Sequence, residues 1–127
     1  MGQDRVRLLI DSVILIDHFN GIERATAYLA STQGQAAISV ITRAEVLAGF
    51  DEAGAIAAQR LLDCFPTLPI EKETADLAAR LRRAYRWKLP DAFQAALAQK
   101  NGLRLVTRNT SDFPPDRHSF VLVPYDV

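Results

Sequence analysis

Four acidic residues, Asp11, Glu45, Asp91 and Asp112, stand where apolar runs of the chain end or where helices are expected to begin. If the fold brings their side chains together, the carboxylate oxygens form the kind of ligand set that Mg²⁺ or Mn²⁺ prefers. A divalent ion held in this way can activate a water molecule and stabilise negative charge on a phosphate oxygen. The chemistry that these residues indicate is therefore metal-assisted hydrolysis.

A zinc site is a poor match to the same residues. Cys64 is the only cysteine, and His18 and His118 are the only histidines, whereas zinc sites normally use several such side chains. The single cysteine also excludes a disulfide within the chain. Because leucines and a phenylalanine stand close to it in the sequence, Cys64 is predicted to be a small core residue.

Each acid also has an interpretation that needs no metal. Asp11 could cap the helix that follows it, and Thr42 with Glu45 fits the capping box, in which the glutamate bonds to a backbone amide. Asp91 opens a predicted helix, where the helix dipole favours a carboxylate. Asp112 could simply form a turn. Taken one at a time, none of the four indicates a metal site.

Apolar runs and helical periodicity predict the elements that must position these acids. Short buried strands are predicted at residues 6–10, 36–40, 103–106 and 120–123, with an extended link or edge strand at 68–70. Helices are predicted at residues 13–19, 22–30, 41–50, 52–64, 73–86 and 92–100. This alternation predicts an α/β fold, a three-layer α/β/α sandwich around a central, mostly parallel sheet.

Sheets of this kind bind ligands beyond the carboxyl ends of their strands. Asp11 and Asp112 follow two of the predicted strands, while Glu45 and Asp91 lie early in two of the predicted helices. The four carboxylates are therefore expected to converge at one edge of the sheet. Their mutual repulsion there would be costly unless a cation lies among them.

The composition is that of one ordinary globular domain, and residues 1–127 are expected to form it. Apolar residues make up 49% of the chain and charged residues 24%, which argues against a disordered or fibrous protein. No apolar run approaches the roughly 20 residues that span a bilayer, so a cytoplasmic protein without a membrane segment is expected. The formal net charge of zero excludes binding of nucleic acid by bulk attraction.

A polyanion would have to be held locally, and the predicted helix at residues 73–86 offers the best candidates. The outer side of this helix and the residues after it form a basic stripe, in which Tyr85 and Trp87 are interleaved. The basic residues are Arg80, Arg82, Arg83, Arg86 and Lys88. Such a stripe can contact a phosphate backbone and stack bases. It can equally be a solvated surface, and the helical periodicity puts Tyr85 on the core side.

Two further arginines, Arg43 and Arg108, are candidates for RNA contact because each stands close in sequence to a proposed site residue. Either could instead be an ion-pair partner of an acid.

Four segments carry a resemblance to a known family. They are LLIDSVILID at residues 8–17, SVITRAEVLAG at 39–49, LPDA at 89–92 and TRNTSDF at 107–113. Together, in this order and over essentially the whole chain, they resemble PIN domains, and in particular the VapC-type toxins of bacterial toxin–antitoxin pairs. The resemblance implies an α/β/α sandwich and an endoribonuclease that uses Mg²⁺ or Mn²⁺. It also implies a homodimer and an antitoxin protein whose C-terminal segment covers the active site.

Within that resemblance, Asp11, Glu45 and Asp91 match three acidic residues of the family's active site. Some relatives carry the fourth acid at the position of Asn109 and others at the position of Asp112. Asp112 is therefore the better candidate for a direct or water-mediated ligand, and Asn109 could offer a neutral oxygen or a hydrogen bond to the substrate.

Residues beside the acids complete the expected site. Ser12 keeps the hydroxyl that the family usually has after the first acid, whereas Val13 replaces a residue that is commonly polar. Ser12 and Thr107 could orient ligands or the attacking water. Asp17 is expected in a surface or capping role.

Three other functions stay open on the sequence. A regulatory α/β domain could bind Mg²⁺ without catalysis, although such a domain is expected to carry a lysine where this chain has Thr107-Arg108-Asn109. A hydrolase acting on a sugar or another small molecule could use paired carboxylates without a metal. A pure interaction domain could carry the acids as helix caps, and added Mn²⁺ or Mg²⁺ would then not stabilise it.

Overall fold

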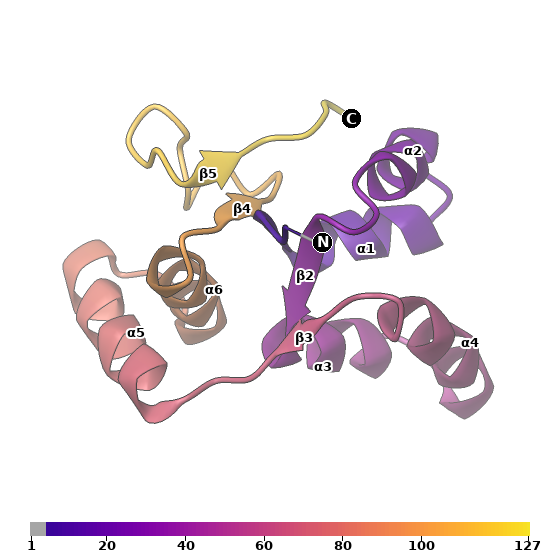
Figure 1. Cartoon of the computed structure of the whole chain (residues 1–127), viewed down its shortest axis with the longest axis horizontal. Coiled ribbons are helices and arrows are strands. Elements are labelled where there is room, and N and C mark those ends of the chain that lie inside the picture. Colours follow the sequence, from indigo (N-terminus) through magenta and orange to yellow (C-terminus); the bar gives the residue numbers. More distant parts are fainter. Residues whose placement is uncertain (1–4) are drawn as a thin grey trace.

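The fold is built on a five-stranded parallel sheet with the strand order β3-β2-β1-β4-β5. The structure is a computed structural model and describes residues 5–127. Figure 1 shows the short strands following one another across the middle of the molecule. Their bounds are β1 (Leu8–Ile10), β2 (Ala36–Ser39), β3 (Thr67–Leu68), β4 (Arg104–Val106) and β5 (Val121–Leu122).

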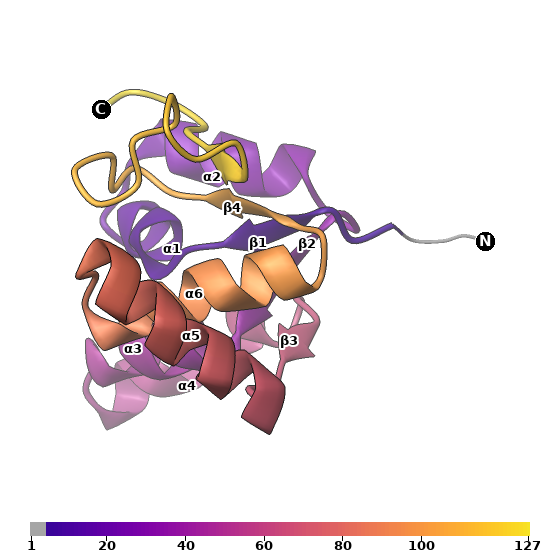
Figure 2. The same cartoon turned by 90° about the vertical axis from the view of Figure 1, so that its left-hand side faces the viewer.

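Helices cover both faces of this sheet. Figures 1 and 2 show α5 and α6 on one face and the remaining helices on the other. The helices are α1 (Ser12–Phe19), α2 (Glu23–Ser31), α3 (Val40–Ala48), α4 (Glu52–Leu62), α5 (Lys72–Tyr85) and α6 (Leu89–Lys100). The predicted three-layer α/β/α sandwich is confirmed. No helix within residues 5–127 is both long and apolar enough to cross a membrane.

Strand β1 explains why the apolar runs in this sequence are continuous rather than alternating. Leu9 packs into the core between the sheet and α5 with α6, whereas Leu8 and Ile10 pack into the core on the side of α1 to α4. All three side chains are buried because successive residues of a strand point to opposite faces. A central strand covered on both faces must therefore be apolar at every position.

The predicted elements are all present, with ends shifted by at most three residues, but two side chains lie elsewhere than expected. Cys64 is exposed rather than part of the core, because α4 ends at Leu62 and the cysteine stands in the following turn. Tyr85 is 51% exposed. It is the last residue of α5, and its ring stacks on Trp87 beyond the helix end instead of packing against the sheet.

A buried ion pair ties the segment after β4 to α1, and a hydrogen bond from the segment after β5 joins it. Asp17 is only 4% exposed, so the expectation of a surface or capping role is wrong. Arg108 donates to it from Nε to Oδ2 at 2.6 Å and from Nη2 to Oδ1 at 2.8 Å, and the Tyr125 hydroxyl donates to Oδ2 at 2.8 Å. The hydrogen bonds from Arg108, with a smaller contribution from Tyr125, hold the pKa of Asp17 below its ordinary value despite burial.

Replacing this arginine tests the ion pair. Arg108→Met is expected to lower the free energy of unfolding at neutral pH by about 2 to 3 kcal/mol, because it leaves a buried carboxylate without its cation. Urea unfolding measures the change. Removing the acid as well, in an Asp17→Asn, Arg108→Met double variant, should recover most of the loss. Unchanged stability in Arg108→Met would mean that the pair does not hold the segment.

Candidate active site

The register of the sheet places three polar residues side by side at its carboxyl edge. Parallel pairing of β1 with β4 puts Asp11 beside Thr107, and pairing of β1 with β2 puts Ser39 on the other side. All three residues are buried. The carboxylate that directly follows the central strand is therefore surrounded by hydroxyl groups from both neighbouring strands.

The Asp11 side chain is 7% exposed and accepts three hydrogen bonds. Thr107 Oγ1 donates to Oδ2 at 2.7 Å, the backbone amide of Ser12 donates to Oδ1 at 2.8 Å, and Gln94 Nε2 donates to Oδ1 at 3.3 Å. The bond from Ser12 makes Asp11 the N-cap of α1, so the capping interpretation is correct. Capping does not exclude a ligand role, because each carboxylate oxygen has two lone pairs.

Gln94 joins Asp11 to the end of β2 and the start of α3. Its side chain is 2% exposed; Oε1 accepts from Ser39 Oγ at 2.7 Å and Nε2 donates to Thr42 Oγ1 at 2.6 Å. Ser39 Oγ also accepts from the backbone amide of Thr42 at 3.0 Å. Sequence reasoning missed Gln94 and Ser39. The available signal was a glutamine on the buried face of an alanine-rich helix, one turn after Asp91.

Ser39, rather than Thr42, is the N-cap of α3, so the capping-box interpretation of Glu45 is wrong. Thr42 lies inside the helix, where its hydroxyl belongs to the network around Gln94. Glu45 follows one turn later with an exposed side chain. Its carboxylate is therefore not used by the backbone and stays available at the edge of the site.

The pKa of Asp91 indicates that the four acids lie near one another. Asp91 lies half-buried in the first turn of α6. Burial, and after it the negative charges of Asp11, Asp112 and Glu45 in that order, raise the pKa of its carboxyl to about 6, although Lys88 acts to lower it. The acids that the sequence singled out thus act on one another within a single electrostatic site.

The loop after β4 supplies the fourth acid. Asn109 Nδ2 donates to Asp112 Oδ2 at 3.0 Å, and Asn109 Oδ1 accepts from Ser111 Oγ at 3.0 Å. The backbone amide of Asn109 donates to Thr107 Oγ1 at 3.0 Å. Both polar atoms of the Asn109 side chain are therefore engaged within the loop, where they orient Asp112.

The donor set fits a hard divalent cation in its chemistry. The four acids offer only carboxylate oxygens, and none of them forms an ion pair with a basic side chain among residues 5–127. The raised pKa of Asp91 reflects burial first and then the neighbouring negative charges, and a divalent cation would neutralise those charges. In the same range, no three acidic, cysteine or histidine side chains are close enough to enclose an ion. Water molecules would have to complete the coordination, as is usual for Mg²⁺.

Two of the arginines considered for RNA contact are used in ion pairs. Arg43 Nη1 lies 2.9 Å from Asp63 Oδ1 at the surface, and Arg108 binds the buried Asp17. The ion-pair alternative therefore describes both, although neither partner is one of the four site acids.

The remaining three candidates, Arg80, Arg83 and Arg86, are exposed on α5 or at its end. Arg83 and Arg86, together with Arg82, line a groove of about 490 Å³ that ends at Leu89. We call this feature the basic groove. A role of these arginines in RNA contact stays a prediction.

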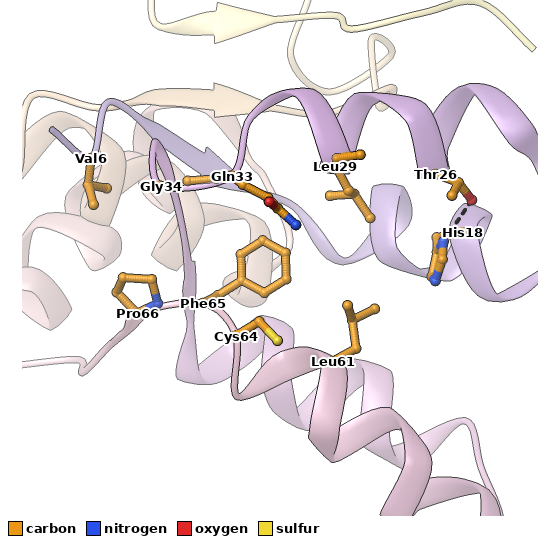
Figure 3. Close-up of a pocket in the computed structure, with 12 residues that line it drawn as sticks. Val6, His18, Thr26, Leu29, Gln33, Gly34, Leu61, Cys64, Phe65 and Pro66 are labelled. Atoms are coloured by element: carbon orange, nitrogen blue, oxygen red, sulfur yellow. Dashed lines mark hydrogen bonds between the residues drawn. The ribbon is translucent and has the colours of Figure 1, made fainter. Parts of the chain in front are cut away.

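A separate cleft of about 540 Å³ lies between α2 and α4 (Figure 3). Leu29, Leu61 and Phe65 line it, and His18 Nδ1 lies 2.7 Å from Thr26 Oγ1 at one end. Its lining is mostly apolar and includes none of the four acids. This cleft is therefore not part of the candidate active site.

Comparison with known proteins identifies the family. The model of the PIN domain matches residues 8–114, a span that holds the four acids, Thr107 and Gln94. This chain belongs to the PIN-domain family. Ribonuclease VapC10 of Mycobacterium tuberculosis is 36% identical to this PIN domain over 114 residues, which cover 84% of this chain and 86% of the relative.

Solved structures agree with this assignment. A toxin–antitoxin complex from Klebsiella pneumoniae contains a chain 38% identical to this PIN domain, with a TM-score of 0.85 over 94% of this chain and 99% of that chain. The FitAcB structure from Neisseria gonorrhoeae matches with a TM-score of 0.76 at 24% identity, over 94% and 99% of the two chains, which shows the fold alone. The sequence resemblance to PIN domains and VapC-type toxins is confirmed.

Gln94 offers a test of the buried network. Gln94→Leu is expected to lower the free energy of unfolding by about 2 to 3 kcal/mol, because Ser39 loses its acceptor and Thr42 and Asp11 lose a donor. Thermal and urea unfolding measure the change. The matched control is Gln99→Leu, which makes the same replacement at an exposed position of the same helix. Equal stability of the two variants would contradict the network.

The raised pKa of Asp91 predicts how stability depends on pH when no metal is added. The carboxyl is protonated in both folded and unfolded chains below about pH 3.8, and stability is lost as pH rises through the folded-state value of about 6. Asp91→Asn should therefore stabilise the metal-free protein above pH 6 by about 1 kcal/mol, since water partly screens a half-buried group. The advantage should vanish near pH 4. Unfolding in a chelator across this range checks it, and a pH-independent difference would rule out the cause given.

Proposed function

We propose that this chain is a metal-dependent endoribonuclease and the toxin of a VapBC-type toxin–antitoxin pair. The observation that carries the proposal is the convergence of Asp11, Glu45, Asp91 and Asp112 at the carboxyl edge of a PIN-domain sheet. The relative named Ribonuclease VapC10, at 36% identity over most of both chains, supports the same activity.

Asp11, Asp91, Glu45 and Asp112 would hold one or two Mg²⁺ or Mn²⁺ ions. When bound, such an ion supplies activation of a water molecule and neutralisation of charge on the phosphodiester and the leaving oxygen. Asp11 is the most rigid of the four ligands, since Thr107 and Gln94 fix its two oxygens. Its orientation is therefore set before any ligand arrives, which limits the entropic cost of assembling the site.

The protein must also hold RNA beside a cluster of acids that repels phosphate. The basic groove along Arg82, Arg83 and Arg86 would supply cations close to the acids, because Arg86 stands only a few residues before Asp91. A phosphate chain in this groove would pass toward the start of α6. The net charge of zero means that this local attraction replaces bulk attraction.

A cognate antitoxin and a second copy of the chain are the protein partners that we propose. The structural match to a toxin–antitoxin complex from Klebsiella pneumoniae supports the first of these. The second rests on the family resemblance alone.

Two other functions would require the site to work differently. A regulatory domain would bind the cation without cleaving RNA. A metal-free hydrolase would keep its activity in excess chelator. Burial of Asp91 together with the nearby charges of the other three acids favours a site that takes up a cation over either a set of helix caps or a metal-free pair of acids.

The deciding experiment is cleavage of total cellular RNA by the purified chain with Mg²⁺ or Mn²⁺. We expect cleavage that a chelator abolishes and that an Asp11→Asn, Asp91→Asn variant reduces by more than about a hundredfold, the upper range for loss of a supporting residue alone. The matched control is Glu23→Gln, Glu52→Gln, which removes two exposed negative charges from α2 and α4.

The alternatives have distinct outcomes. Folded wild-type protein that cleaves no RNA with either metal, but gains thermal stability from them, would indicate a non-catalytic metal-binding domain. Cleavage that survives the chelator would contradict the metal requirement. Equal loss in the acidic control would show that the two site residues act only through net charge.

A further inference from the structure

A small aromatic cleft lies directly beside Asp112. Its volume is about 290 Å³, and its lining includes Tyr85, Trp87, Ser111, Asp112, Arg117 and His118. Pockets that hold small organic ligands range from about 300 to 1,000 Å³. This cleft is therefore of a size for one planar ring system rather than for a long ligand.

The walls of the cleft are aromatic rings in a fixed arrangement. Tyr85 stacks on Trp87 with ring centroids 4.5 Å apart and planes inclined by 16°. His118 meets both rings edge-on, at 5.1 Å from Tyr85 and 5.3 Å from Trp87. Phe113 supports Trp87 from the core at 4.7 Å. Trp87 is 3% exposed, whereas Tyr85 is 51% exposed, so an aromatic surface stays open to solvent on top of a buried ring.

The backbone around the cleft is shaped to hold this arrangement. Arg86 stands between Tyr85 and Trp87 in the sequence. It is the one described residue other than glycine with a positive φ, at 61°, a conformation that costs roughly 1 kcal/mol for an ordinary side chain. Arg82 Nη1 donates to the carbonyl of Trp87 at 2.6 Å, and Trp87 Nε1 donates to the carbonyl of Asp112 at 2.8 Å. The aromatic stack is therefore tied to the loop that carries the fourth acid.

We propose that this cleft binds a nucleobase of single-stranded RNA next to the phosphate that is cleaved. The inference rests on the proposed nuclease function and adds to it a subsite for the base. Exposed aromatic rings beside positive charge are the usual means of binding single-stranded nucleic acid, because every base has a π-face that can stack. Tyr85 provides the stacking surface, and Arg117 provides a cation in the lining of the same cleft.

The position of the cleft makes the base and the cleavage site neighbours. Asp112 lines the cleft and is also one of the four acids of the candidate active site. Arg86, which follows Tyr85 in the sequence, lines the basic groove. A strand of RNA held by its phosphates in the basic groove and by one base in the aromatic cleft would thus be anchored on both sides of the turn that leads to Asp91.

The single tryptophan of the chain gives a direct readout that does not depend on cleavage. The fluorescence emission of Trp87 should change when uridine 5′-monophosphate or adenosine 5′-monophosphate is added to the wild-type protein in the presence of a chelator. Ribose 5-phosphate, which has the sugar and phosphate but no base, should have little effect. An equal response to ribose 5-phosphate, or no response to any of the three, would overturn the base subsite.

Substitution of Tyr85 separates stacking from bulk. With single-stranded RNA and the cleavage-deficient Asp11→Asn, Asp91→Asn background, adding Tyr85→Leu should weaken binding by about five- to hundredfold, the range for one stacked base. Tyr85→Phe keeps the ring and should bind within about twofold of its parent. Similar loss in the phenylalanine and leucine variants, or no loss in either, would contradict stacking.

Cleavage by the otherwise wild-type protein then distinguishes the two proposals. If the nuclease function is right and the subsite is right, Tyr85→Leu should raise KM far more than it lowers kcat, and Tyr85→Phe should leave both nearly unchanged. Nucleotide-dependent emission in a protein that cleaves no RNA would overturn the nuclease proposal alone. Normal cleavage by Tyr85→Leu with no emission change would overturn the subsite alone.

Discussion

The constraint on which the site depends is the burial of one carboxylate without a cation to pair with it. Asp11 lies at the end of the central strand, 7% exposed, and hydrogen bonds from Thr107, Gln94 and the backbone of Ser12 satisfy its oxygens. These hydrogen bonds satisfy the oxygens of the buried carboxylate without bringing a positive charge into the site. The site can therefore remain acidic, which an ion pair such as that of Arg108 with Asp17 would prevent.

The register of the parallel strands produces this arrangement. Because β1 is parallel to both neighbours, the residues at the carboxyl ends of the three strands lie side by side, and two of them, Thr107 and Ser39, carry hydroxyl groups. Gln94 on α6 then bridges from Ser39 and Thr42 to Asp11. A polar network that is satisfied throughout can be buried at little cost, whereas a partly satisfied one cannot. The helix that carries Asp91 is thereby fixed against the strand that carries Asp11.

The fold and the acids could be predicted from the sequence, because strands buried on both faces read as apolar runs and parallel strands place their following residues at one edge. The partners of those acids could not. Gln94 is a single polar residue whose meaning depends on which face of α6 is buried, and Asp17 looked exposed because its cation, Arg108, is distant in the sequence. Tyr85 was assigned to the core by helical periodicity, which ceases to apply at the residue where α5 ends.

The basic side chains of this protein differ in whether an acid already pairs with them. Arg43 and Arg108 are used in ion pairs, whereas Arg83, Arg86 and Lys88, around the end of α5, are exposed and form no ion pair among the described residues. The segment from Arg82 to Asp91 contains residues that line the basic groove, the stacked rings of Tyr85 and Trp87, and the half-buried carboxylate of Asp91 itself. A strained backbone at Arg86 is understandable in such a turn, because it sends consecutive side chains in different directions over a very short length of chain. The basic side chains that attract phosphate and the carboxylates that repel it thereby point to different places, although both belong to the same short segment.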